Sequence, residues 1–458
     1  MNSFSPSVPA IASPWWRELN RYHWFVLIVA ALGWLFDCLD QQLFNLARVP
    51  AMKELLGPGQ NFNEYGGYAT AIFLIGWASG GLFFGVLGDR IGRAKTMMWT
   101  ILIYSLCTGL SALSTGFWDF AFYRFITGLG VGGEFAVGVS LVAEVMPDRT
   151  RPYALGLLQA LSAFGNVTAA LISMGFGYLQ ASGVIGSAWR WMFVVGALPA
   201  LLALVIRSRL KEPEKWQAAK ASGQKHEIKL GSYGELFRNP RWRKNAIVGL
   251  LMAFSGIVGL WGIGFFSIDL IRSVLQKTFV AKGVNPAEIP GKLTFWAGMT
   301  SMMLNIGAFP GIYSFGIVSQ RIGRRPTFAI SFVLAMLSTA MVFWFLKDFS
   351  DIFWMIPLMG FCLLSLFGGY AVYFPELFPT HLRSTGTSFC YNVGRFVAAS
   401  GPFTLGLLTS RVFHEYPEPM RYAGLTMCSI FLVGLLVLPF APETKDQPLP
   451  ENEKGFTH

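Results

Sequence analysis

Long apolar runs alternate with short polar stretches along the whole chain. The runs are long enough for helices that cross a bilayer, which need about 20 residues each. Their apolar character is continuous and not alternating, which favours helices over the strands of a barrel. The pattern therefore predicts an all-α membrane protein with twelve transmembrane helices, at residues 23–47, 66–88, 95–114, 117–146, 152–180, 189–207, 244–275, 294–319, 326–346, 352–376, 384–410 and 422–440.

Two motifs recur at nearly the same offset, which predicts an internal repeat. The stretch GVLGDRIGRAK at 85–95 returns as GIVSQRIGRRP at 316–326, 231 residues later. Glu144-x-x-Pro147-x-x-x-Arg151 returns as Glu376-x-x-Pro379-x-x-x-Arg383, 232 residues later. Six spans per repeat give both halves the same orientation, as in transporters whose site lies between parallel repeats. We therefore predict a tail 1–22, a six-helix bundle 23–207, a linker 208–243, a second bundle 244–440 and a tail 441–458.

Composition and charge support a membrane protein and set its orientation. Hydrophobic residues make up 53% of the chain and charged residues only 13%, whereas soluble domains carry about 25% charged residues. The net charge of +11 indicates basic loops facing the cytoplasm and not nucleic-acid binding. Lys and Arg gather in the linker and in the loops on its side, so both termini are expected in the cytoplasm of a cell with a bacterial inner membrane.

The repeated motif identifies a family resemblance. GVLGDRIGRAK resembles the signature between spans two and three of the major facilitator superfamily, with Asp89, Arg90 and Arg93 in place. The second copy has Gln320 where the first has Asp89. The segment RFITGLGVGGE at 124–134 is similar to the superfamily's fourth span. The resemblance implies a transporter that works by alternating access, without a cofactor, and as a monomer.

Shorter motifs point to particular families within this superfamily. Asp37-x-x-Asp40 resembles the first span of aromatic acid:proton symporters, and Gly132-Gly133-Glu134 is similar to sialate, niacin and other metabolite:proton symporters. The stretches 375–386 and 442–445 resemble sugar porters and organic-ion transporters. Two further sugar-porter motifs, Gln-Leu-Ser in span seven and Gly-Pro-x-x-Trp in span ten, are absent, which weighs against a sugar.

Three carboxylates within the predicted spans are candidates for carrying a coupled proton. Asp37 and Asp40 share one face of the first, and an ionised residue there costs roughly 2.5–3.5 kcal/mol to insert. Helix rise puts them level with Arg124, about 10 Å inside the fourth span. Either a proton on one Asp releases Arg124 to bind an anion, or the pair is permanent and structural. Glu134, about 15 Å further inward, is a second proton site or the partner of a cation.

Arg395 is a second cation near mid-membrane, with Tyr391 and Asn392 one turn before it. An arginine there suits a substrate carboxylate, although a buried partner such as Asp269 would also account for it. We expect other polar and aromatic residues within the spans to line the substrate cavity: Gln41, Gln159, Asn166, Trp261, Asn305 and Tyr370.

The resemblance also implies a gate at the cytoplasmic helix ends. Asp89, Arg90 and Arg93 would join span eleven and nearby acids in a network that holds the outward-open state. Candidate inter-helix pairs are Glu144 with Arg151 and Glu376 with Arg383. The alternative is that these arginines only set the topology.

These observations lead to one functional hypothesis with two alternatives. We predict a proton-coupled symporter that imports a small organic anion, a mono- or aromatic carboxylate, with the proton gradient as its energy source. The alternatives are a transporter of a polyol, sugar or organic cation with the same fold, and a non-transporting membrane sensor. The sequence contains no HExxH motif, no phosphate-binding loop and no paired cysteine motif, so an enzyme or a metal site is not expected.

Overall fold

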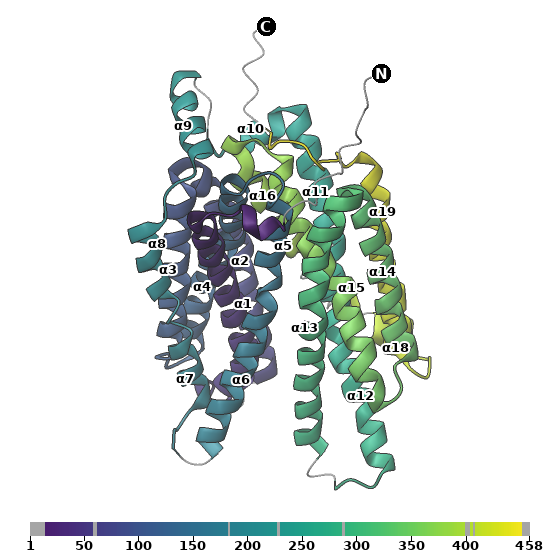
Figure 1. Ribbon diagram of the computed structural model, residues 1–458. Helices are drawn as coiled ribbons and strands as arrows, with labels where there is room; N and C mark the ends of the chain where they lie inside the picture. Colours follow the sequence, from purple (N-terminus) through teal and green to yellow (C-terminus); the bar gives the residue numbers. More distant parts are fainter. Residues whose placement is uncertain are drawn as a thin grey trace, which may run out of the picture.

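The computed structural model describes residues 14–57, 62–181, 184–226, 230–285, 289–398, 404–405 and 408–450. Regular structure in these residues is entirely helical. Figure 1 shows two groups of helices side by side, with α9 (Glu214–His226) and α10 (Tyr233–Arg238) at one end. We call that end the linker end and the opposite one the far end. Parts of the predicted tails 1–22 and 441–458 and of span 384–410 lie outside the described residues.

The first group of helices comes from the N-terminal half. Its members are α1 (Arg21–Leu55), α2 (Phe62–Ile91), α3 (Arg93–Ser111), α4 (Phe117–Val145), α5 (Arg151–Ala160), α6 (Ser162–Ala181), α7 (Ala188–Val195) and α8 (Ala200–Arg209). The second group comes from the C-terminal half. Its members are α11 (Pro240–Val258), α12 (Ser267–Ala281), α13 (Ile289–Ile322), α14 (Arg324–Phe345), α15 (Ile352–Tyr373), α16 (Arg383–Ala398), α18 (Pro419–Met427) and α19 (Ile430–Val437).

Several predicted spans are interrupted helices. Span 152–180 is divided into α5 and α6, and span 189–207 into α7 and α8, where Pro199 precedes α8. Span 244–275 consists of α11, a π-helical turn at Gly259–Ile263, a 3-10 turn and α12. π-helical turns inside longer helices occur often at functional sites.

Among the described residues, nine helical segments are long and apolar enough to cross a membrane. The predicted spans 95–114, 189–207 and 384–410 are not among these nine. The first corresponds to α3 and the last to α16, and both carry a row of buried polar side chains. The described part of α16 is also only 16 residues long. Buried polar rows are typical of helices that line a functional region of a membrane protein.

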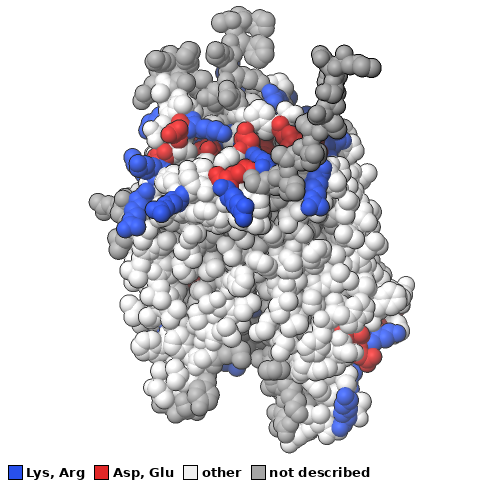
Figure 2. Space-filling model, in the orientation of Figure 1, with Lys and Arg blue, Asp and Glu red and all other residues white. Residues whose placement is uncertain are grey.

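The exterior of the helical groups is apolar. Large hydrophobic side chains on the helices are well exposed, among them Phe83, Trp99, Leu171, Ile306, Leu337 and Leu436. Figure 2 shows the charged side chains gathered at the linker end, with a smaller group at the far end and an uncharged band between them. This distribution suits a protein whose middle is surrounded by lipid.

The internal repeat is visible in matching contacts. Arg190 donates to the carbonyls of Ala112 and Ser114 beyond α3. Arg421, 231 residues later, donates in the same way to the carbonyls of Phe343 and Trp344 at the end of α14. Arginine therefore satisfies the free carbonyls at a helix C-terminus in both halves.

A second matching pair lies at the linker end. The Glu212 carboxylate accepts from the backbone N–H groups of Ala94 and Lys95 at the start of α3. The Glu443 carboxylate accepts from those of Arg324 and Arg325 at the start of α14. A carboxylate at a helix N-terminus is stabilised by the free N–H groups and by the helix dipole.

Candidate functional site

Asp40 and Arg124 form a buried ion pair within the N-terminal half. Both side chains are fully buried, and Asp40 Oδ2 lies 3.6 Å from Arg124 Nη1. Thr108 of α3 donates to the other carboxylate oxygen at 2.6 Å. Ser111 accepts from Arg124 Nη2 at 2.8 Å and Thr127 accepts at 3.1 Å. The pair thus joins α1 to α4, with α3 supplying hydroxyl groups to both partners.

Asp37 lies one turn of α1 before Asp40 and has a different environment. It is fully buried, and neither carboxylate oxygen has a hydrogen-bond partner among the described residues. The hydroxyl of Tyr104 on α3 is also buried and has no hydrogen-bond partner in the described part of the chain. A buried carboxylate without a partner is costly, so the structure gives Asp37 and Asp40 different roles.

Glu134 lies further along α4 and is 1% exposed. Its Oε2 lies 2.7 Å from Thr100 Oγ1, and its Oε1 has no partner among the described residues. In the part of the chain that is described, no cation forms an ion pair with Glu134, and no group of three His, Cys, Asp or Glu side chains is arranged to hold a metal ion. Glu134 is therefore a second buried acid without a counter-charge.

Arg395 of α16 lies between the two halves. It is 6% exposed, and its guanidinium carbon lies 3.9 Å from the Trp77 ring centre and 4.6 Å from that of Tyr391. Trp77 belongs to α2, so the stack crosses from one half to the other. Arg395 Nε has no hydrogen-bond partner, and no carboxylate pairs with Arg395 among the described residues. The side chain of Asp269, the alternative partner, lies outside the described part.

Aromatic rings continue from this cation into the N-terminal half. Tyr391 stacks on Phe135 of α4 with ring centres 4.0 Å apart, and Phe135 contacts Trp34 of α1 at 4.8 Å. The indole N–H groups of Trp34 and Trp77 are buried and have no hydrogen-bond partner within the described ranges. We call Trp34, Trp77, Phe135, Tyr391 and Arg395 the aromatic cluster. It combines one cation, two free N–H donors and flat apolar faces, which together suit an aromatic ring that carries a carboxylate.

Two other predicted lining residues, Asn166 and Asn392, also contact the opposite half. Asn166 on α6 donates to Asn305 on α13 at 3.0 Å. Asn392 Nδ2 lies 3.5 Å from the Gly132 carbonyl of α4, and Asn392 Oδ1 is unpartnered. Gln159 is 4% exposed with Oε1 unpartnered, and Gln41 is half-buried on α1.

Two predicted lining residues have other surroundings. The Tyr370 hydroxyl donates to the Met252 carbonyl at 2.7 Å, and its ring stacks on Phe374, so it packs α15 against α11 inside the C-terminal half. We therefore leave Tyr370 out of the proposed cavity. Trp261 is half-buried in the π-helical turn of span seven.

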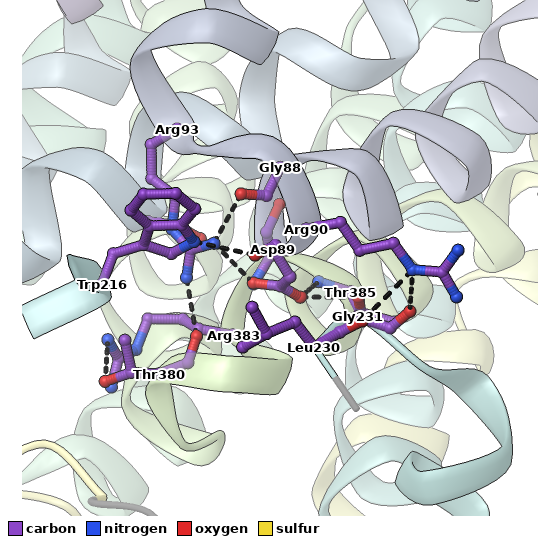
Figure 3. A network of polar contacts seen from close by, with 12 residues as sticks. Gly88, Asp89, Arg90, Arg93, Trp216, Leu230, Gly231, Thr380, Arg383 and Thr385 are labelled. Carbon is purple, nitrogen blue, oxygen red and sulfur yellow. Dashed lines mark hydrogen bonds and ion pairs between the residues drawn. The ribbon is translucent and has the colours of Figure 1, made fainter. Parts of the chain in front are cut away.

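The predicted gate residue Asp89 joins the two halves at the linker end (Figure 3). Its carboxylate accepts from the backbone N–H of Ser384 at 3.1 Å and of Thr385 at 2.8 Å. The Thr385 hydroxyl adds a bond at 2.6 Å. Ser384 and Thr385 begin α16, so a carboxylate of one half caps a helix of the other.

Arg93 and Glu144 continue this network. Arg93 pairs with Asp89 at 2.7 Å and with Glu144 at 2.9 Å, and it also donates to the Thr380 carbonyl at 2.7 Å. Glu144 in turn pairs with Arg383 of the C-terminal half at 2.6 Å. Every charged member of this network is buried, and such pairs are costly to break from one side.

The predicted pairings Glu144–Arg151 and Glu376–Arg383 are wrong. Arg151 pairs with Asp148, and Glu376 pairs with Arg324 at 2.9 Å. The reason is local, because each of these arginines turns back to a carbonyl eight residues earlier, Ala143 for Arg151 and Pro375 for Arg383. The Glu144 carboxylate therefore faces Arg93 at the start of α3, and the Glu376 carboxylate faces Arg324 at the start of α14.

Arg90 takes part in a different contact from the expected one. Its Nε donates to the carbonyls of Leu230 and Gly231 in the linker at 3.2 Å (Figure 3). Trp216 of α9 donates to the Asp89 carbonyl at 2.7 Å. The linker is therefore fastened to the helix end that carries the gate.

Comparison with known proteins decides the family. Residues 24–402 match the family model of the Major Facilitator Superfamily. The chain belongs to the Major Facilitator Superfamily. It is therefore a multi-pass membrane transporter with the twelve-span fold of that superfamily, not an enzyme.

Related superfamily members carry names of small-metabolite transporters. A putative metabolite transport protein of Haemophilus influenzae is 31% identical over 94% of this chain and 99% of its own length. A probable 4-methylmuconolactone transporter of Cupriavidus pinatubonensis is 30% identical over 89% of this chain and 88% of its own. The sialic acid transporter NanX of Escherichia coli is 28% identical over 93% and 96%.

A solved superfamily structure has the same fold. The proton:xylose symporter XylE bound to 6-bromo-6-deoxy-D-glucose aligns with a TM-score of 0.72 at 17% identity, covering 93% of this chain and 98% of that one. At this identity the likeness shows the fold alone.

Sequence reasoning missed one face of α3. Thr100, Tyr104, Thr108 and Ser111 recur at intervals of three and four residues, and each faces an ionisable residue of α1 or α4. That spacing marks a single helix face, so the row was visible in the sequence. Trp34, Trp77 and Phe135 carried no such signal, because aromatic residues are common throughout the spans.

Proposed function

We propose that this superfamily member is a proton-coupled symporter that imports a small organic anion, a mono- or aromatic carboxylate, by alternating access. The observation that carries the proposal is Arg395, a buried cation between the halves whose Nε has no hydrogen-bond partner among the described residues. A bound carboxylate would supply the missing counter-charge through charge-assisted hydrogen bonds. The relative named as a sialic acid transporter supports an acid as substrate.

Proton coupling is supported by the buried acids of the N-terminal half. Asp40 faces a cation, whereas Asp37 and Glu134 have no ion pair among the described residues. A buried acid without a counter-charge favours its neutral form. Proton binding during import would therefore offset the charge of the incoming carboxylate.

We further propose that the linker end faces the cytoplasm and that this conformation is closed on that side. The charged side chains gather at that end (Figure 2), as expected for cytoplasmic loops. A membrane-impermeant maleimide should label Ala218→Cys on α9 only after the cells are permeabilised. Thr115→Cys at the far end should react in intact cells, and the reverse pattern would overturn the orientation.

The test of function is uptake of radiolabelled benzoate by purified protein in liposomes. An outside-acid pH gradient should drive initial uptake above that of protein-free liposomes, into which neutral benzoic acid also diffuses, and a protonophore should abolish the excess. Accumulation that ignored both treatments would contradict proton coupling. Arg395→Ala should lose uptake, while Arg411→Ala, which alters an exposed arginine near the far end, should keep it.

A thermal-shift screen separates the substrate classes. Benzoate should stabilise the purified protein through mass action, and xylitol and choline should not. Stabilisation by either of these instead of benzoate would favour a neutral substrate or an organic cation.

A further inference from the structure

The hydroxyl group of Thr100 has one hydrogen but two potential acceptors. Its Oγ1 lies 2.9 Å from the Met97 carbonyl and 2.7 Å from Glu134 Oε2. A hydroxyl donates only one hydrogen bond and accepts others through its lone pairs. Both short contacts are satisfied together only if one of them is donated to Thr100.

The Met97 carbonyl is an acceptor and cannot donate, so the donor must be Glu134. A protonated Glu134 donates its O–H to Thr100, and Thr100 donates to Met97. An ionised Glu134 would compete with the carbonyl for one hydrogen, and its other oxygen, Oε1, would stay unpartnered and buried. That arrangement costs more than the neutral one.

Asp40 shows the opposite arrangement. Thr108 Oγ1 lies 2.6 Å from Asp40 Oδ1, and no competing acceptor of this hydroxyl is found among the described residues. Thr108 is therefore free to donate to an ionised carboxylate, whose charge Arg124 balances at 3.6 Å. Two Thr–carboxyl contacts on the same two helices thus differ in the direction of the hydrogen bond.

Among the described residues, the groups around Glu134 provide no positive charge. Gly33 of α1 packs against it so closely that a Cβ atom there would overlap Oε1. Two ionisable groups, Asp37 on α1 and Tyr104 on α3, interact electrostatically with Glu134. An acid and a phenol leave the neutral form of Glu134 favoured.

We infer that Glu134 holds the coupled proton in this conformation, while Asp40 stays ionised as the fixed counter-ion of Arg124. This rests on the proposed symport and assigns its proton to one residue. In the cycle, Glu134 gains an O–H bond when a proton arrives from the far side. When the halves open at the linker end, that bond breaks, the proton passes to water, and a carboxylate remains.

Infrared spectroscopy tests the assignment without any substrate. Full-length protein in lipid vesicles at neutral pH should show the carbonyl stretch of a protonated carboxyl group. Glu134→Gln should lose one component of this absorption while the component of buried Asp37 remains, and Thr100→Val, which keeps the volume but removes the hydroxyl acceptor, should shift the Glu134 component. Asp40→Asn, the matched control, should keep it. Identical spectra for the wild type, Glu134→Gln and Thr100→Val would overturn the assignment.

Transport supplies a second readout. Glu134→Gln should accumulate benzoate at least tenfold less than the wild type under an outside-acid gradient, and wild-type accumulation in this variant would contradict the inference. Failure of the wild type itself to respond to the gradient would instead contradict the proposed symport, and the infrared band would still report the proton on Glu134. The two failures are therefore distinguishable.

Discussion

The guanidinium group of Arg395 in the C-terminal half lies over the ring of Trp77 in the N-terminal half, 3.9 Å from the guanidinium carbon to the ring centre. A stack of this kind is worth about 0.5–2 kcal/mol, the more so when water is excluded. It holds a buried cation in place without neutralising it. The charge thus remains available to an anion, and its position depends on contact between the halves.

Replacing Trp77 should therefore weaken anion binding. Trp77→Leu removes the ring that orients Arg395, and we expect benzoate affinity to fall about tenfold, which corresponds to about 1.4 kcal/mol. Isothermal titration calorimetry on purified protein measures this directly. Trp99→Leu is the matched control, because Trp99 lies on the apolar exterior and is 50% exposed. Equal affinities in the two variants would argue against a role for the stack.

The gate contact of Asp89 leads to a second prediction. In Asp89→Asn an amide replaces the carboxylate, which only accepts hydrogen bonds. The NH₂ group of the new side chain then faces the backbone N–H groups at the start of α16. Leaving a buried donor unpaired costs about 1–3 kcal/mol. The variant should shift the population toward a form open at the linker end. With spin labels at Lys95→Cys and Arg321→Cys, double electron–electron resonance should measure a longer distance between the labels than in the protein with Asp89.

Gln320 supplies the control for that experiment. It occupies the repeat position equivalent to Asp89, but its amide donates to Asp446 of the same half. The position equivalent to Ser384 is Pro152, which has no N–H to donate. Gln320→Ala should therefore leave the label distance unchanged, and a similar lengthening in both variants would argue against an Asp89 latch.

The apolar runs and the repeat were sufficient to predict the twelve-span fold, because lipid forces long continuous helices on the sequence. Counting helix rise also put Asp40 at the level of Arg124, which lies 3.6 Å away. This succeeded because depth along a straight helix follows from residue number alone.

Side-chain partners were harder to predict than depth. Glu144 and Arg151 share a motif, but the chain turns between them: Glu144 pairs with arginines at the start of α3 and α16, and Arg151 pairs with Asp148 in the turn before α5. The aromatic cluster draws residues from α1, α2, α4 and α16. Which face of each helix meets the others depends on helix rotation and tilt, which packing determines and apolar periodicity does not.

The Asp40–Arg124 pair predicts a non-additive effect on stability. Asp40→Asn leaves Arg124 buried without its counter-charge, which costs about 3–5 kcal/mol. Arg124→Gln likewise leaves the Asp40 carboxylate buried without its counter-charge. The double variant should be more stable than the sum of the two single changes implies, as coupled residues are. Thermal unfolding in detergent tests this, and strict additivity would show that the two side chains do not interact.

Acidification should weaken the linker end through Glu443. Burial alone would raise the pKa of this carboxyl, but the N–H groups of Arg324, Arg325, Lys445 and Thr444 outweigh it and lower the pKa below its usual value. A group whose pKa is lowered on folding stabilises the protein above its unfolded pKa of about 4.3. That contribution is lost as the pH falls below this value toward the folded pKa.

The measurement is thermal stability as a function of pH. The melting temperature of the wild type should fall as the pH is lowered from 5 to the acid limit of the assay (roughly pH 3), the range in which a glutamate titrates. Glu443→Gln should start lower and lose less over the same range, because it has no proton to gain. Parallel curves for the two proteins would show that Glu443 does not contribute to the loss of stability in acid.

Gly33 offers a way to move Glu134 without changing its chemistry. A Cβ atom at Gly33 would overlap the carboxyl oxygen of Glu134, which sits at the end of a flexible side chain. Gly33→Ala should therefore fold, aided by up to about 1 kcal/mol of helix propensity, but displace Glu134 from Thr100. We expect the infrared carboxyl band to shift and gradient-driven benzoate accumulation to fall. Gly138→Ala on α4 is the control, since a Cβ there meets nothing within 4 Å. If Gly33→Ala behaved like Gly138→Ala, the position of Glu134 against Thr100 would not matter for coupling.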